Sequence, residues 1–258
     1  MFRYQSREIR TLGALLLDIG AMLMCAGANT ARIRITINRI SLAHGYAADL
    51  FITSRALTLT LADKDDEDVF SRSKRTPPHG VNFKVVSGIS RMSWRVVEEQ
   101  WTIAMMRQEL QRLASLPEYP RLAVLLMVGL AGAAFCRLAG GDPVEMGIAF
   151  AASLLGLVVR QEAHARQFNP YICVYLAALT AALVSGAFMK FDQRHSLEHA
   201  FATSVLFLVP GVPLINAFSD LMDGNFLTGL SRMMHGLIIS FCIALGLLTA
   251  NYTYGFQP

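Results

Sequence analysis

The chain has 258 residues, of which 53% are hydrophobic and 16% are charged, and its mean hydropathy is +0.41. A soluble globular domain carries about one quarter charged residues, so this composition excludes a single soluble domain, while the charge excludes a chain that lies in a membrane throughout. Residues 1–120 hold 16 of the 23 Lys and Arg and 12 of the 19 Asp and Glu. The net charge of +4 therefore belongs to this mixed-charge first half, and nucleic acid is not an expected partner.

Two amphipathic helices are predicted at the N-terminus. Apolar residues recur at three- and four-residue spacing over residues 6–26, which is a helical period. The stretch Gly27–Thr30 then indicates a helix stop followed by a helix cap, because Gly ends helices and Asn or Thr begins them. A second helix is expected over about residues 30–44.

The rest of the first half predicts strands and one further helix. Alternating apolar residues over Leu50–Leu61 are typical of a strand, a short segment is expected at Val69–Lys74, and another strand at Val81–Val86. Apolar residues at helical spacing predict one long helix over Met92–Leu113. Residues 1–116 are therefore predicted to form a soluble α+β domain.

From residue 117 onward, apolar stretches alternate with short polar connections. Each stretch has about 17–20 residues, close to the number that crosses a hydrocarbon core of about 30 Å as a helix. Because lipid cannot satisfy free backbone groups, these stretches are expected to be helical. The five predicted spans are 122–138, 143–159, 170–189, 200–217 and 233–250. The fold class expected is a mainly α membrane protein, in which a transmembrane domain of about five helices, residues 117–258, follows the soluble domain.

The soluble half is expected to lie in the cytoplasm. It is rich in charge, and the apolar run over residues 11–26 is interrupted by Asp18 and does not fit a cleavable export signal. In that orientation, four arginines flank the inner ends of the spans and three basic residues flank the outer ends. This is a slight positive-inside bias.

The sequence contains no motif for enzyme or metal chemistry. The four cysteines and six histidines form no Cys-x-x-Cys pair, no His-Glu-x-x-His motif and no spacing of metal ligands. A glycine-rich phosphate loop and a Gly-x-Ser-x-Gly elbow are also absent from the sequence. No catalytic residue, metal site or cofactor is therefore predicted, and an enzyme is not expected.

Several polar residues beside the spans have a structural explanation. Asp142, Pro143 and Glu145 stand at the N-cap, first and third positions of a predicted helix, which is the spacing of a capping box. Asn169-Pro170 and Ser196-Leu197-Glu198 likewise predict helix caps.

One segment does not fit a regular span. Pro210, Gly211 and Pro213 lie at the end of the fourth predicted span, where proline removes an N–H and clashes with an earlier carbonyl, so the helix must kink or open. Irregular backbone at membrane depth is tolerated only when it packs in protein or lines a watery cavity, and transporters bind small polar solutes at such breaks. Asn216 and Asp220 follow the break, and they are expected to act as polar ligands of the substrate, or Asp220 as a proton-coupling acid. The alternative is a kink that only shapes the packing.

Two arginines complete the predicted substrate pathway. Arg232 opens the last span, and Arg137 lies near the end of the first, where an arginine close to an apolar core can face a pathway or extend to the interface. The predicted pathway residues are Pro210, Gly211, Pro213, Asn216, Asp220, Arg232 and Arg137.

These residues resemble the signature of the threonine/serine exporter family. The run 208–217, followed by Asp220, Gly224-Asn225 and Gly229–Arg232, looks like the signature itself. Gly27–Arg32 is similar to the family's early helix junction, with Asn29 where an acidic residue is more usual. The resemblance covers almost the whole chain.

The chain is most similar to the split, short form of the family, the YjjP type, in which a small second membrane protein of the YjjB type supplies the rest. The resemblance implies a multi-pass subunit in the bacterial inner membrane that exports small carboxylate-bearing metabolites, either threonine and serine or succinate-like dicarboxylates. The partners implied are this substrate, the lipid bilayer, the second subunit and further copies of the chain. The alternatives are a membrane-anchored scaffold or sensor and a membrane-anchored hydrolase, each with the soluble domain as its active part.

Overall fold

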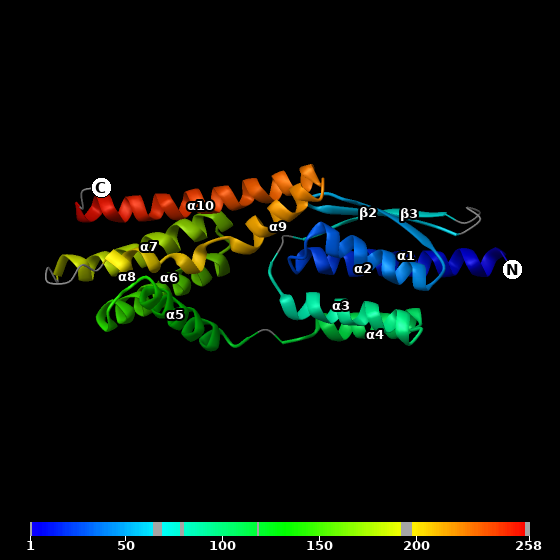
Figure 1. Ribbon diagram of the computed structural model, residues 1–258, viewed down its shortest axis with the longest axis horizontal. Helices are drawn as coiled ribbons and strands as arrows, with labels where there is room; N and C mark the ends of the chain where they lie inside the picture. The colour runs from blue at the N-terminus through cyan, green and yellow to red at the C-terminus, as the bar shows by residue number, and fades with distance from the viewer. Residues whose placement is uncertain (1, 64–68, 78–79, 118, 192–197, 256–258) are drawn as a thin grey trace. The chain divides into compact units, whose positions relative to one another are not determined.

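The computed structural model describes residues 2–63, 69–77, 80–117, 119–191 and 198–255. The chain is mainly helical with one small sheet, and it forms two compact units (Figure 1). The first unit comprises Met1–Pro117 together with Val212–Met234, and the second comprises Glu118–Gly211 together with His235–Pro258. Residues 212–234, which the predicted membrane domain of 117–258 includes, thus pack with the N-terminal residues.

The first unit is built on two consecutive helices, α1 (Phe2–Cys25) and α2 (Thr30–Ala43). Four side chains on one face of α1 are completely buried: Leu12, Leu16, Ile19 and Leu23. Gly27 ends α1 with a φ of 86°, a conformation that glycine adopts at no steric cost. The side chain of Asn29 accepts a hydrogen bond from the amide of Arg32 and caps α2. Both predicted helices and the cap between them are confirmed.

An antiparallel sheet in the order β1-β2-β3 covers one side of these helices (Figure 1). Its strands are β1 (Ala47–Ile52), β2 (Ala56–Ala62) and β3 (Val69–Arg75), and the inner leucines of β2 are fully buried. The short segment predicted at Val69–Lys74 is therefore a strand. The single strand predicted over Leu50–Leu61 is wrong, because the Thr53 hydroxyl bonds the Ala56 backbone and closes a turn between β1 and β2.

Two helices, α3 (Phe83–Glu98) and α4 (Ile103–Ala114), pack on the other side of α1 and α2 (Figure 1). The strand predicted at Val81–Val86 is wrong, because the Asn82 side chain caps a helix that begins at Phe83. The long helix predicted over Met92–Leu113 is also wrong. Gln100 has a φ of 51° and Thr102 caps a new helix, so the chain turns while apolar side chains on both helices continue to fill one core.

The second unit contains most of the long apolar helices. Among the described residues, four helices are long and apolar enough to cross a membrane: α5 (Arg121–Leu138), α6 (Pro143–Ala165), α7 (Pro170–Phe191) and α10 (Phe226–Tyr254). The interrupted pair Glu198–Leu208 and Gly211–Met222 is a fifth candidate if it is one span. The structure therefore has the four to five apolar spans of a multi-pass membrane protein.

Small residues bring the helices of the second unit close together. A Cβ on Gly132 of α5 would overlap the Ser153 hydroxyl of α6, and one on Gly246 of α10 would lie 2.8 Å from Ala178 of α7. Without a hydrophobic driving force between helices in lipid, close backbone approach of this kind is what holds membrane helices together. Glycine, alanine and serine therefore form the closest contacts between these helices.

Candidate functional site

The predicted fourth span is interrupted. α8 (Glu198–Thr203) is followed by the 3-10 turn η1 (Leu206–Leu208), and α9 (Gly211–Met222) begins only after Val209 and Pro210. The Leu208 amide donates to the Val205 carbonyl, three residues back, instead of the Ser204 carbonyl. The kink or opening predicted from the prolines is present. As a result, the Ser204 carbonyl does not accept the helical hydrogen bond from the Leu208 amide.

Serine hydroxyls from two neighbouring helices hold this interruption. Ser153 of α6 donates to the free Ser204 carbonyl at 3.1 Å, and the hydroxyl of Ser185 of α7 lies 3.5 Å from that of Ser204. All three serines are completely buried. An unpaired carbonyl at membrane depth costs several kcal/mol, so these contacts make the interruption stable. Sequence reasoning missed Ser153 and Ser185, whose only signal was a hydroxyl inside an apolar span.

The start of α9 offers few free amide donors. Gly211 donates its amide to the Val209 carbonyl at 2.9 Å, and Pro213 has no N–H. Among the first three residues of α9, Val212 is therefore the one whose backbone amide is neither bonded to Val209 nor removed by proline. A carboxylate that binds at this helix start would therefore need side-chain donors as well.

Three of the predicted pathway residues meet at the turn between α1 and α2. We call Asn216, Asp220 and Arg232 the clamp, because each bonds the backbone of Gly27–Thr30. Asn216 Nδ2 donates to the Gly27 carbonyl at 2.8 Å, and Arg232 Nη2 donates to the Ala28 carbonyl at 3.1 Å. Asp220 Oδ1 accepts the Thr30 amide at 3.0 Å. The two segments on which the family resemblance depends are thus in direct contact within the first unit.

The clamp contains a buried ion pair. Asp220 is 0% exposed, and its Oδ2 lies 3.1 Å from Nη1 of Arg232, whose side chain is 12% exposed. The Asp220 carboxylate also lies at the first turn of α2, where the helix dipole favours a negative charge. Asp220 Oδ2 and Arg232 Nη1 have no aligned hydrogen bond, so the attraction between them is mainly coulombic. The carboxylate and the guanidinium therefore neutralise each other, and the arrangement is suited to holding α9 in place.

The turn between α1 and α2 that the clamp bonds is also hydrogen-bonded by the segment before α3. The Gly80 amide donates to the Cys25 carbonyl at 2.8 Å, and the Asn82 amide donates to the Ala26 carbonyl at 3.0 Å. Burial raises the pKa of the Cys25 thiol above its ordinary value, so the thiol is protonated at neutral pH. The turn between α1 and α2 is thus a structural junction whose carbonyls are bonded on both sides.

The remaining predicted residues lie elsewhere. Arg137, at the end of α5 in the second unit, donates from Nη1 to the Gly141 carbonyl at 3.3 Å. Pro210 and Gly211 also belong to the second unit, whereas Pro213 belongs to the first. The structure therefore brings together the three clamp residues and does not place Arg137 in their unit.

Two of the helix caps predicted for the second unit are present. Asp142 and Glu145 form the capping box, and Asn169 accepts the Tyr171 amide at 2.9 Å, so both caps are confirmed. The cap predicted at Ser196 lies outside the described residues. Glu145 has a further contact that the sequence did not predict, because its Oε1 lies 3.3 Å from Nδ1 of His199 on α8.

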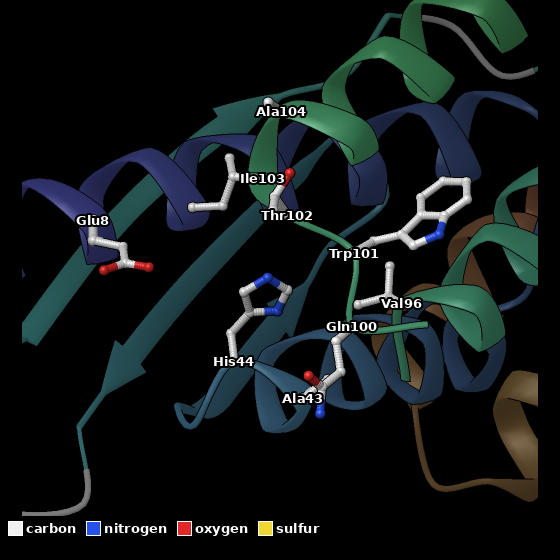
Figure 2. Close-up of a pocket in the computed structure, with 9 residues that line it drawn as sticks. All are labelled: Glu8, Ala43, His44, Val96, Gln100, Trp101, Thr102, Ile103 and Ala104. Atoms are coloured by element: carbon white, nitrogen blue, oxygen red, sulfur yellow. The ribbon is translucent and has the colours of Figure 1, made fainter. Parts of the chain in front are cut away.

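The first unit also contains a cavity of about 580 Å³ that sequence reasoning did not predict. In Figure 2 the His44 ring points into the space between Glu8 and the connection from α3 to α4. The lining residues are Glu8, Ala43, His44, Val96, Gln100, Trp101, Thr102, Ile103 and Ala104. No predicted pathway residue lines it. Among the residues that the structure describes, no group of three or more His, Cys, Asp or Glu could hold a metal ion.

Comparison with known proteins gives one family over nearly the whole chain. The family model described as "Putative threonine/serine exporter" matches residues 14–254. The "Probable succinate transporter subunit YjjP" of Escherichia coli is 29% identical over 264 residues and covers 98% of each chain. The protein of the same name from Klebsiella aerogenes is 29% identical over 254 residues, covering 97% of this chain and 96% of its own. No solved structure matches. The chain therefore belongs to the threonine/serine exporter family.

Proposed function

We propose that this chain is one subunit of a bacterial inner-membrane exporter that moves small carboxylate-bearing metabolites out of the cell together with a second membrane subunit. Family membership and the four to five apolar spans support a multi-pass membrane exporter. The names of the two relatives support a dicarboxylate as substrate and a complex of more than one chain. Threonine, serine and succinate all carry a carboxylate, which is the chemistry that the proposal requires.

The observation that carries the proposal is the interrupted fourth span. A chain that only anchors a soluble domain gains nothing from breaking a membrane helix, since each freed backbone group must find a new partner. Here Ser153 supplies that partner to Ser204 from a neighbouring helix. Discontinuous helices of this kind are where secondary transporters bind their solutes.

The predicted pathway residues take different roles in this proposal. Pro210, Gly211 and Pro213 form the opened backbone past which the substrate moves. The clamp sets the position of α9, because its polar atoms bond the turn between α1 and α2. With the N-terminal residues in the cytoplasm, Arg137 lies at the outer end of α5, where its charge attracts a departing carboxylate.

A bulky residue at Gly211 tests the pathway. A Cβ added at Gly211 meets nothing within 4 Å, so Gly211→Leu is compatible with the fold. If the substrate passes the opened backbone, the leucine side chain occupies its path, and we expect at least a tenfold loss of carboxylate efflux from loaded cells at an unchanged amount of membrane protein. The measurement is efflux of labelled succinate and threonine from cells that also produce the YjjB-type subunit.

Gly147 provides the matched control. It lies in α6, and a Cβ there also meets nothing within 4 Å, so Gly147→Leu adds the same bulk away from the interruption. We expect wild-type efflux from this variant. Normal efflux from Gly211→Leu, or an equal loss from both variants, would rule out the interruption as the pathway.

A further inference from the structure

The hairpin of residues 211–234 has an unusual distribution of polarity. We use this name for α9, the following turn and the first residues of α10, all within the first unit. Its inner face carries the clamp and Thr228, a buried residue whose hydroxyl donates to the Ile52 carbonyl at 3.2 Å. Its outer face carries large apolar side chains that are 50–87% exposed: Phe218, Met222, Phe226, Leu227, Leu230 and Met234. A surface in contact with water has the opposite arrangement, so this outer face requires a covering.

α10 is longer than a membrane crossing requires. α10 has 29 residues, or about 43 Å at 1.5 Å per residue, whereas a hydrocarbon core of about 30 Å needs about 20. Residues 235–254 are enough to cross, and residues 226–234 are the part that packs with the first unit. With residues 235–254 as the crossing part, Phe226, Leu227 and Leu230 lie outside the hydrocarbon, where burial of their exposed side chains requires a protein partner.

The exposed side of α10 has the spacing of a surface that packs against another helix. Exposed apolar residues follow one another at intervals of three and four from the hairpin into the membrane part of α10: Leu227, Leu230, Met234, Leu237, Phe241 and Leu245. Alternating intervals of three and four bury a continuous seam against a neighbouring helix. A soluble partner would cover only the hairpin end of this seam, whereas a membrane helix with a cytoplasmic extension covers all of it.

We infer that the outer face of the hairpin, with the continuing seam on α10, is the docking surface for the second membrane subunit of the exporter. The partner supplies an apolar, uncharged helix that leaves the membrane on the cytoplasmic side. The inference rests on the proposed function and deepens it, because the relatives' names say "subunit" without a surface for the partner. Since the clamp fixes the inner face of the same hairpin, docking on the outer face connects the partner to α9.

The test introduces charge into the seam. Leu227 and Leu230 are 77% and 55% exposed, so Leu227→Glu with Leu230→Glu leaves the core of the first unit intact. The full chain, carrying a tag, is coexpressed with the YjjB-type subunit, extracted in mild detergent and purified. We expect at least a tenfold drop in the amount of copurified second subunit per tagged chain, with an unchanged melting temperature for the tagged chain alone.

A second pair of exposed apolar residues in the same unit gives the control. Ile35 and Leu42 on α2 are 56% and 68% exposed, and Ile35→Glu with Leu42→Glu is expected to copurify the second subunit as the wild type does. Copurification of the second subunit with the Leu227/Leu230 variant at the wild-type level overturns the inference. If the variant loses self-association but keeps the second subunit, the face binds a second copy of this chain and the inference is also overturned. If the double variant unfolds, Leu230→Gln alone is tested against the same two results.

The failure of this inference can be distinguished from the failure of the proposed function. If the wild-type pair exports a carboxylate while the Leu227/Leu230 variant still copurifies its partner, the docking surface is wrong and the exporter stands. If the wild-type chain copurifies the second subunit through this face but the pair moves no carboxylate, the surface stands and the exporter is wrong.

Discussion

Replacing Asp220 by alanine will destabilise the chain by about 3–5 kcal/mol, because the substitution leaves a buried guanidinium without its anion. The Asp220 carboxylate is the partner of Arg232 Nη1 at 3.1 Å and the acceptor for the Thr30 amide at 3.0 Å. Both groups lose their partner together, and the N-terminus of α2 loses a favourable charge. The measurement is thermal unfolding of the full chain in detergent, together with the amount of folded protein in the membrane.

Asp223 is the matched control for this prediction. It lies three residues further along the same hairpin and its side chain is exposed, so Asp223→Ala is expected to change the stability by no more than about 0.5 kcal/mol. Equal stability of the Asp220→Ala chain and the wild type would show that the ion pair does not hold the hairpin. Asp220→Leu combined with Arg232→Leu removes both charges, and we expect it to be more stable than Asp220→Ala.

The same double variant separates a positioning role of Asp220 from a role in proton coupling. If Asp220 only holds α9, carboxylate efflux follows the stability of the chain, so the Asp220→Leu/Arg232→Leu variant exports more than the Asp220→Ala variant. If Asp220 carries a proton, efflux stays absent however stable the chain becomes, and the conservative Asp220→Asn chain also loses its proton dependence. We expect recovery of efflux, because both oxygens of Asp220 face groups of the first unit.

Local sequence patterns predict the structure correctly where contacts between neighbouring residues decide it. Gly27 and Asn29 end one helix and begin the next through their own backbone and side-chain preferences, as did Asp142 and Glu145 in their capping box. The strand predicted at Val81–Val86 failed for a related reason. The β-branched residues there favour a strand, but the Asn82 cap and the core contacts of α3 outweigh this weak preference.

The clamp could not be predicted from the sequence because its contacts are not local. Thr30 and Asp220 are 190 residues apart, and nothing in the spacing of either segment says that they meet. The family resemblance includes both segments, one as the signature and one as the early helix junction, without indicating that they touch. The sequence pattern predicted Asp220 and Arg232 along a substrate pathway. In the structure, the clamp side chains bond a backbone turn. Polar residues after a broken helix are thus compatible with either role until their partners are known.

The interruption of the fourth span depends on how closely α6 approaches it, and Gly156 sets that approach. A Cβ on Gly156 would lie 2.9 Å from the Ala177 carbonyl of α7 and 3.0 Å from the Phe207 ring of η1. A side chain at position 156 would therefore collide with the backbone of α7 and with the 3-10 turn at the break. We expect Gly156→Leu to cost about 3 kcal/mol or more, since the new side chain must push α6 away from both.

The expected result is a loss of folded chain, measured by size-exclusion chromatography in detergent and by thermal unfolding, with Gly147→Leu on the same helix at the wild-type level. Gly156→Ala should be intermediate, because only a methyl group must be accommodated. Export is expected to fall as well. When α6 moves away, the Ser153 hydroxyl no longer donates its 3.1 Å hydrogen bond to the Ser204 carbonyl. A Gly156→Leu chain that folds and exports normally would mean that α6 does not support the break, and the serine contacts would then lose their role in holding it open.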